Sequence, residues 1–259
     1  VEKVKEDLIE NNKKAEWVPK YVQEKRFHNW LQDARDWCIS RSRSWGNPMP
    51  IWVSDDFEEK VCISSLKELY ELTGVSDLED IHREFLDHLT IPSKQGKGVL
   101  KRIPEVFDCW FESGSMPFAQ DHYPFENKDI FDEAYPADFI SEGVDQTRGW
   151  FFTLHAISGM LFDSIAFKNV VSTGLVLDKN GNKMSKRLGN GVDPFSTIEK
   201  FGSDPLRWYM MTNASPWDNL KFDQEGIAEV QRKLFGTLYN TYGFYALYAN
   251  VDGFVPNVS

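Results

Sequence analysis

The segment Lys183–Arg187 (KMSKR) places three cations within five residues. A turn-forming run (DKNG, residues 178–181) precedes it, and a second glycine-containing run (LGNG, residues 188–191) follows it. No carboxylate occurs between Asp178 and Asp193, so this loop is cationic within a chain whose formal net charge is −11. Lysines on a glycine-flanked loop can stabilise a phosphate whose charge changes during a reaction. The segment therefore indicates a phosphate-binding loop, and the alternative is an ordinary solvated lysine turn.

A second candidate site lies in residues 142–150 (EGVDQTRGW). Its first glycine permits a tight turn and lets a ligand approach the backbone. Its carboxylates can accept hydrogen bonds, and its glutamine and its tryptophan, four residues apart, share one helix face. A polar rim over an apolar wall suits a small amphiphilic ligand. The candidate residues are Glu142, Gly143, Asp145, Gln146 and Trp150. The alternative is a capped helix with the tryptophan in the core.

A strand–helix–strand pattern positions both candidate sites. Residues 137–141 form a short apolar strand, a helix should run to about residue 162, and residues 168–177 form a long β-branched strand. Such a βαβ unit predicts two parallel strands joined by a right-handed crossover. Ligands in these sheets bind beyond the carboxyl ends of the strands. We therefore expect Glu142 and Lys186 to border one cleft.

The whole chain divides into four predicted segments. These are a helical lead-in with a first core strand (1–50), a connective insertion (51–134), a nucleotide-binding half-fold with the KMSKR loop (135–193) and a helical region (194–259). Within the lead-in, residues 1–35 should be helical with a break at Pro19. The insertion should contain a helix at 77–88 and a strand at 106–111. Asp223 should begin a long helix. Its apolar face would comprise Ile227, Val230, Leu234, Leu238 and Tyr242.

Composition excludes several classes of protein. Charged residues at 27% and hydrophobic residues at 41% are typical of a soluble globular chain, and no apolar run approaches the roughly 20 residues needed to cross a bilayer. The three cysteines form no Cys-x-x-Cys pair, which argues against a disulfide framework and a zinc site and suits a reducing cytoplasm. We assign no metal site. An acidic chain is not a generic nucleic-acid binder, and dinucleotide and P-loop signatures do not occur.

Taken together, these segments resemble the class I aminoacyl-tRNA synthetases. The pentapeptide at 183–187 is similar to their KMSKS loop, with Arg187 where serine is commonest. Residues 36–46 (DWCISRSRSWG), 107–117 (FDCWFESGSMP) and 138–151 (DFISEGVDQTRGWF) resemble the isoleucyl members of the class. The valyl members are the nearest rival. The resemblance covers nearly the whole chain.

The resemblance implies an α/β fold: half of a Rossmann-like nucleotide-binding parallel sheet with an α+β insertion, followed by an α-helical stem region that leads to an anticodon-binding bundle. It implies ATP-dependent activation of isoleucine and its transfer to tRNA(Ile), with Mg²⁺ accompanying ATP, in a cytoplasmic and monomeric ligase. Lys183 and Lys186 would be catalytic and contact the ATP phosphates. The adenylate would be held by Glu142, Gly143, Asp145, Gly174 and Lys186. The isoleucine side chain would be enclosed by Trp110, Gln146 and Trp150.

The His-Ile-Gly-His motif of the class does not occur in this sequence. We therefore expect a piece of a longer protein, and we expect the isolated piece to bind ligands weakly and not to aminoacylate. Three alternatives stay open: a valyl or leucyl ligase, a non-catalytic binding module, and an unrelated nucleotidyltransferase. The presence of Lys183, Lys186 and Glu142 counts against the binding module, since a site that has lost its catalytic function does not need these residues.

Overall fold

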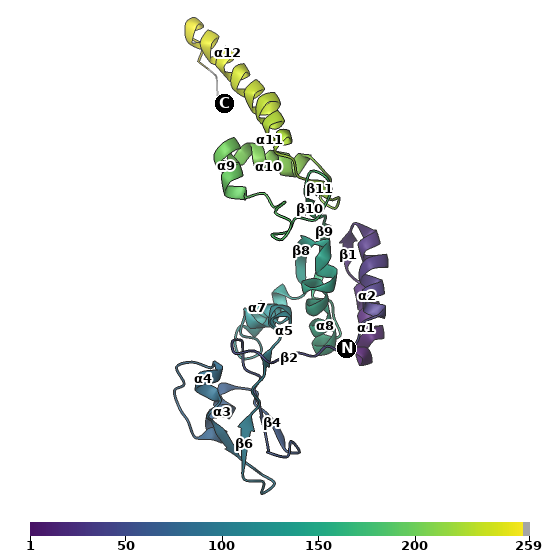
Figure 1. Cartoon of the computed structure of the whole chain (residues 1–259), viewed down its shortest axis with the longest axis vertical. Coiled ribbons are helices and arrows are strands. Elements are labelled where there is room, and N and C mark those ends of the chain that lie inside the picture. The colour runs from purple at the N-terminus through teal and green to yellow at the C-terminus, as the bar shows by residue number, and fades with distance from the viewer. Residues whose placement is uncertain (256–259) are drawn as a thin grey trace. The chain divides into compact units, whose positions relative to one another are not determined.

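The computed structural model describes residues 1–255, which form two compact units (Figure 1). The first unit comprises Val1–Glu16, Gln23–Asp138 and Gln146–Lys168. The second comprises Trp17–Val22, Phe139–Asp145 and the residues from Asn169 onward. Across residues 1–255, no helix combines the length and the apolar character that a membrane crossing needs.

The first unit has a helical core built around α8 (Trp150–Phe162). Every residue of α8 from Phe151 to Gly159 is buried, as expected of a helix that is apolar on all sides. Figure 1 shows α1 (Lys5–Asn12) and α2 (His28–Gln32) beside α8. Leu8, Phe27 and Leu31 fill the space between the helices and are almost completely buried. Further short helical segments of this unit are Glu2–Val4, Met116–Ala119 and Lys128–Ala134, and those at Val22–Phe27 and Val144–Arg148 have their first residues in the second unit.

His155 is buried on α8 and its Nε2 lies 2.8 Å from the carbonyl oxygen of Leu8. Burial lowers the pKa of this imidazole from 6.5 to about 4, and the hydrogen bond to Leu8 opposes the shift only in part. The unfolded chain therefore binds a proton between these two pKa values that the folded chain does not bind. The contribution of His155 to the free energy of unfolding is fully present above the pKa of the unfolded chain, and it is lost as the pH decreases toward the pKa of the folded chain.

We expect the free energy of unfolding to fall by about 2 kcal/mol between neutral pH and about pH 5 because of His155 alone. Other titrating groups contribute to the same curve, so His155→Gln is the comparison that isolates this effect. Urea unfolding of both proteins at the two pH values measures it. Equal pH dependence in the two proteins would refute the assignment.

The insertion forms an antiparallel sheet in the order β4-β3-β6-β5. Its strands are β3 (Ile51–Val53), β4 (Lys60–Cys62), β5 (Thr90–Pro92) and β6 (Val99–Arg102). Trp52, Leu100 and Leu69 of α3 (Leu66–Thr73) meet in its core. The buried Arg102 side chain binds Asp87 through two nitrogens and donates to two backbone carbonyls.

Two predictions in the insertion are wrong. The helix predicted at 77–88 reduces to α4 (Arg83–Leu86), because Asp77 adopts a left-handed backbone conformation with φ 59°. The strand predicted at 106–111 stops at β7 (Val106–Phe107), which pairs with β2 (Ser40–Arg41). Asp108 then caps α5 (Cys109–Gly114) by accepting the Trp110 N–H at 3.2 Å, so the rest of the segment is helical.

The second unit contains most of a three-stranded sheet in the order β1-β9-β8. Its strands are β1 (Glu16–Val18), β9 (Phe167–Thr173) and β8 (Ala137–Gly143). The prediction of helix throughout residues 1–35 is wrong at β1, since pairing with β9 overrides the local helical pattern. The strand predicted at 168–177 is also interrupted. It resumes as β10 (Val176–Leu177), which pairs in parallel with β11 (Leu220–Lys221).

The C-terminal helices carry a second small core. Phe201, Tyr209, Leu220 and Ile227 are its buried members. The helices are α9 (Pro194–Phe201), α10 (Ser203–Thr212), α11 (Gln224–Val230) and α12 (Gly236–Asp252), with a π-helical turn at Gln231–Phe235. Asp223 caps α11 as predicted, by accepting the Glu225 N–H at 3.0 Å. Of the residues predicted on one helix face, Ile227 is fully buried, whereas Leu238 is 63% exposed and Tyr242 is 67% exposed.

Candidate nucleotide and amino-acid site

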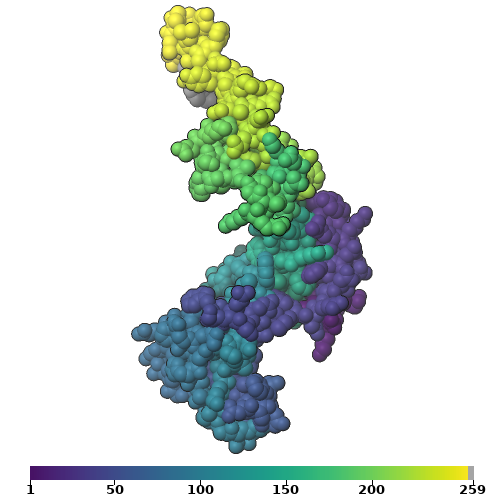
Figure 2. Space-filling model, viewed as in Figure 1, coloured from purple at the N-terminus to yellow at the C-terminus, as the bar shows by residue number. Residues whose placement is uncertain are grey.

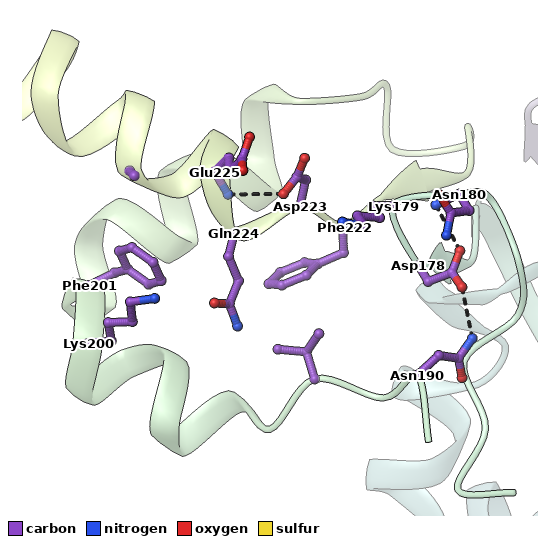
Figure 3. A pocket seen from close by; sticks show the side chains of 12 residues that line it. Asp178, Lys179, Asn180, Asn190, Lys200, Phe201, Phe222, Asp223, Gln224 and Glu225 are labelled. Atoms are coloured by element: carbon purple, nitrogen blue, oxygen red, sulfur yellow. Dashed lines mark hydrogen bonds between the residues drawn. The ribbon is translucent and has the colours of Figure 1, made fainter. Parts of the chain in front are cut away.

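The KMSKR loop, residues 183–187, is held at its base by side-chain hydrogen bonds. Asp178 Oδ1 accepts hydrogen bonds from the backbone N–H groups of Asn180 at 2.9 Å and Asn182 at 2.8 Å. Asp178 Oδ2 accepts a hydrogen bond from Asn190 Nδ2 at 2.9 Å (Figure 3). Asn190 Oδ1 in turn accepts the Ser185 N–H at 2.9 Å. The bond from Asn190, followed by that from Asn182, lowers the pKa of Asp178. The two ends of the loop are thus joined through one carboxylate.

The cations of the loop are free to meet a ligand. Lys183, Lys186 and Arg187 are exposed, and within residues 1–255 no carboxylate lies in ion-pair distance of any of them. Met184 points the other way, into an apolar crevice of about 170 Å³ that Val176 and Phe222 also line. The loop therefore presents unpaired positive charge to solvent, while the half-buried Met184 side chain contributes to the apolar crevice. That arrangement can bind and stabilise phosphate oxygens.

A larger cavity of about 710 Å³ borders the base of the loop (Figure 3). Asp178 and Asn190 form one side of it, and Lys200, Phe222 and Gln224 contribute to the remainder. Its mixture of charged and apolar groups suits no single ligand class. The prediction that Glu142 and Lys186 border one cleft stays a prediction.

Glycines in the second unit allow close approaches that a side chain would block. A Cβ on Gly143 would lie 2.5 Å from Asp145 Oδ1, so the carboxylate folds back over the end of β8. A Cβ on Gly174 would lie 2.1 Å from the carbonyl oxygen of Asp218. The space at Gly174 is therefore filled by the chain's own backbone, and its proposed role beside adenine stays a prediction.

In the first unit, Trp110, Gln146 and Trp150 lie together around Gly149. Gln146 Oε1 accepts the Trp150 N–H at 2.9 Å, and Trp150 Nε1 donates to the carbonyl oxygen of Ser113 at 2.9 Å. A Cβ on Gly149 would lie 2.6 Å from Gln146 Oε1 and 3.2 Å from Trp110 Cη2. We call these four residues the Gly149 cluster. It contains two indole rings and one amide, and Trp110 is 42% exposed.

Asp108 holds the helix that carries Trp110, and sequence reasoning missed it. Its buried carboxylate accepts Trp37 Nε1 at 2.9 Å and Arg41 Nη2 at 2.5 Å while it caps α5. A cavity of about 670 Å³ lies alongside, lined by Arg41 and Trp110 among others. The aspartate before Cys109 could have been read as a helix cap, but its two long-range donors have no signal in the sequence.

Residues 1–223 match the family model described as tRNA synthetases class I (I, L, M and V). The chain belongs to the class I tRNA synthetases. It is 59% identical to the isoleucine–tRNA ligase of Cytophaga hutchinsonii, with 96% of this chain and 23% of that protein covered. It is 54% identical to the cytoplasmic isoleucine–tRNA ligase of Schizosaccharomyces pombe, with 98% of this chain and 24% of that protein covered. The chain thus spans about a quarter of the length of these synthetases.

Solved structures of class I synthetases share the fold. Mycobacterium tuberculosis methionyl-tRNA synthetase bound by methionyl-adenylate matches with a TM-score of 0.63 and 17% identity, over 98% of this chain and 41% of that one. The leucyl-tRNA synthetase of Agrobacterium radiobacter, in complex with tRNA, matches with a TM-score of 0.58 and 20% identity, over 81% of this chain and 29% of that one. The predicted fold class, a Rossmann-like α/β synthetase fold followed by helices, is confirmed.

Gly149→Ala in the complete synthetase tests whether the Gly149 cluster contacts the amino acid. The added methyl group must displace either the Gln146 amide or the Trp110 ring, so we expect the KM for the amino acid to rise about tenfold with kcat little changed. Pyrophosphate exchange measures both constants. Ser113→Ala is the matched control, because it keeps the carbonyl that binds Trp150. An unchanged KM in Gly149→Ala would show that the Gly149 cluster does not contact the amino acid.

Proposed function

We propose that this chain is part of an isoleucine–tRNA ligase, which activates isoleucine with ATP and transfers it to tRNA(Ile). Isoleucine as substrate is supported by relatives of that name, which are 54–59% identical to the chain. Adenylate chemistry is supported by the single feature that carries the proposal, the KMSKR loop with its unpaired, exposed cations. The relatives from two yeasts are named cytoplasmic, and we propose the same location and a monomeric enzyme.

In the first step, a carboxylate oxygen of isoleucine attacks the α-phosphorus of ATP, and the bond from that phosphorus to the bridging oxygen breaks as pyrophosphate leaves. Lys183 and Lys186 would contact the phosphates and offset the charge that grows on the leaving group. Mg²⁺ would arrive with ATP as part of the substrate. Since little covalent chemistry is left to the protein, positioning and charge stabilisation dominate the catalysis.

The remaining site residues would position the two substrates. The adenylate would contact Glu142, Gly143, Asp145 and Gly174 in addition to Lys186. The isoleucine side chain would lie against Trp110, Gln146 and Trp150. In the second step, a terminal ribose hydroxyl of the tRNA attacks the acyl carbon of the adenylate, and AMP leaves with the bonding electrons.

Residues 194–259 would belong to the stem region that leads into an anticodon-binding bundle. We propose that the chain is organised as a lead-in at 1–50, an insertion at 51–134, a half-fold at 135–193 and this stem segment. Support comes from α12, on which Tyr239 is 76% exposed and Phe244 is 68% exposed. Figure 2 shows the side chains of this helix uncovered in the visible face, in yellow. Aromatic side chains of this kind are typical of a helix that packs against further helices.

Amino-acid-dependent pyrophosphate exchange by the complete protein tests the substrate. One methylene in an apolar pocket is worth about 1–3 kcal/mol, a range already known for isoleucyl enzymes, so isoleucine should exceed valine roughly tenfold to two-hundredfold in kcat/KM. Leucine serves as the second comparison. A higher kcat/KM with valine or leucine would assign the chain to the valyl or leucyl ligases instead. Exchange with none of the three would favour the non-catalytic module.

A further inference from the structure

The side chain of Asn190 joins the KMSKR loop to the turn that precedes it (Figure 3). Its Oδ1 accepts the backbone N–H of Ser185 at 2.9 Å. Its Nδ2 donates to Asp178 Oδ2 at 2.9 Å and to the carbonyl oxygen of Lys183 at 3.3 Å. This amide therefore contacts the backbone of the loop at two residues and a carboxylate at the base of the loop.

Asp178 gives the amide a fixed and charged partner. Besides its side-chain contacts with Asn180 and Asn182, its own N–H donates to the carbonyl oxygen of Asn182 at 2.9 Å. The hydrogen bond from Asn190, followed by that from Asn182, holds the pKa of Asp178 below its usual range, so this carboxyl group is ionised at neutral pH. An ionised carboxylate only accepts hydrogen bonds. The residue opposite it must therefore supply a donor.

The lysines of the loop depend on their backbone for their position. The side chains of Lys183 and Lys186 are exposed, and no carboxylate within residues 1–255 lies in ion-pair distance of either. The contacts of Asn190 fall on the backbone of Lys183 itself and of Ser185, the residue before Lys186. A charged group stabilises a transition state only if it is held where the new charge develops. The backbone contacts of Asn190 can supply that order.

We propose that Asn190 is a positioning residue that holds the backbone of the KMSKR loop so that Lys183 and Lys186 meet the ATP phosphates. The inference rests on the proposed function of the chain and adds a residue to its first step. The amide does not itself bind a phosphate in this role. An asparagine Nδ2 has two hydrogens, and Asp178 and the Lys183 carbonyl group already accept both.

Asn190→Asp in the complete enzyme tests the role with almost no change of shape. The new carboxylate can still accept the Ser185 N–H, but it lies opposite Asp178 and has no hydrogen to donate. Since like charges repel and a charge-assisted hydrogen bond is lost, we expect the single-turnover rate of adenylate formation to fall roughly tenfold. The KM for isoleucine should stay unchanged, because the residues proposed to enclose its side chain belong to other segments.

A reciprocal exchange distinguishes positioning from general damage. When Asp178→Asn is added to Asn190→Asp, the amide at 178 can donate to the carboxylate at 190, and its oxygen can still accept the N–H groups of the turn. We expect the double variant to recover to within about threefold of the native rate. A double variant no faster than Asn190→Asp alone would overturn the proposal.

Asn180→Asp is the matched control for Asn190→Asp. It makes the same change of charge in the neighbouring turn, on an exposed asparagine whose side chain has no hydrogen bond within residues 1–255. We expect it to change the rate of adenylate formation less than about threefold, since an exposed charge is largely screened. An equal loss of rate in both variants would attribute the effect to charge alone and refute positioning by Asn190.

Tryptic cleavage of the complete protein gives a readout that does not depend on catalysis. Trypsin cuts after lysine and arginine, and a loop that opens more often is cut faster. We expect cleavage at 183–187 to be several-fold faster in Asn190→Asp than in the native protein and in the double variant. Equal cleavage rates in all three would contradict the proposal. If the native protein exchanged pyrophosphate with no amino acid, the proposed function would fail, and cleavage would still decide whether Asn190 holds the loop.

Discussion

Lys186→Ala in the complete enzyme is expected to slow the formation of isoleucyl-adenylate about a hundredfold or more while leaving the fold intact. Removing one preorganised charged donor costs on the order of 3 kcal/mol in the activation barrier. The side chain of Lys186 is exposed and has no carboxylate partner among the described residues, so its loss should not disturb packing. Single-turnover measurement of pyrophosphate release gives the rate, and thermal unfolding gives the stability.

Lys179→Ala is the matched control for Lys186→Ala. Lys179 is an exposed lysine in the turn that precedes the KMSKR loop, so its removal changes the net charge by the same amount. We expect it to change the rate less than about threefold, since a distant charge in water is largely screened. A change under about threefold in Lys186→Ala, or an equal change in both variants, would exclude direct stabilisation of the phosphates by Lys186.

The KMSKR loop could be predicted from sequence because all its information is local. Lys183, Met184 and Lys186 are close along the chain, and the turn residues Asp178 and Asn190 flank them. Helix starts at Asp193 and Asp223 were predictable for the same reason, since a cap and its N–H donor lie two or three residues apart. Each of these features depends on a single segment.

The Gly149 cluster could be predicted only in part. The residues of 142–150 are continuous, but Trp110 and Ser113 reach them from a different segment through the packing of α5 on α8. Asp108 likewise binds Trp37 and Arg41 across a long loop. Such contacts are decided by tertiary packing, which overrides local propensity, so neither the role of Gly149 nor that of Asp108 follows from spacing.

The break in the strand predicted at 168–177 has the same origin. Gly174 sits where the chain leaves β9, and its N–H donates to the carbonyl oxygen of Pro216 at 2.9 Å. The next N–H, from Leu175, donates to Asn219 Oδ1 at 2.8 Å. These partners come from residues 216–219, and no pattern in the sequence predicts their contact with Gly174 and Leu175. The run of β-branched residues at 168–177 therefore predicts one continuous strand, although the chain passes there from the sheet that contains β9 to the pair β10–β11.

Gly174→Ala is expected to destabilise the second unit by about 3 kcal/mol. Its Cβ would lie 2.1 Å from the carbonyl oxygen of Asp218 and 2.8 Å from the backbone nitrogen of Asn219. Both are backbone atoms, so rotation of a side chain cannot relieve the clash. The 216–219 segment must move, and with it the parallel pairing of β10 with β11, whose Leu220 is buried. Urea unfolding measures the loss as a lower midpoint at an unchanged slope.

Gly191→Ala isolates the steric cause of that loss. No heavy atom lies within 4 Å of a Cβ built on Gly191, so its replacement should change stability by less than about 0.5 kcal/mol. Comparison of Gly174→Ala with Gly191→Ala also distinguishes two explanations for a glycine at position 174, the close approach of the Asp218 backbone and room for adenine. Suppose that Gly174→Ala weakened ATP binding by the complete enzyme but left stability unchanged. The glycine would then be required to leave room for adenine, and not because Asp218 approaches it closely. If Gly174→Ala lowered stability as expected, the backbone contact alone requires a residue without a side chain.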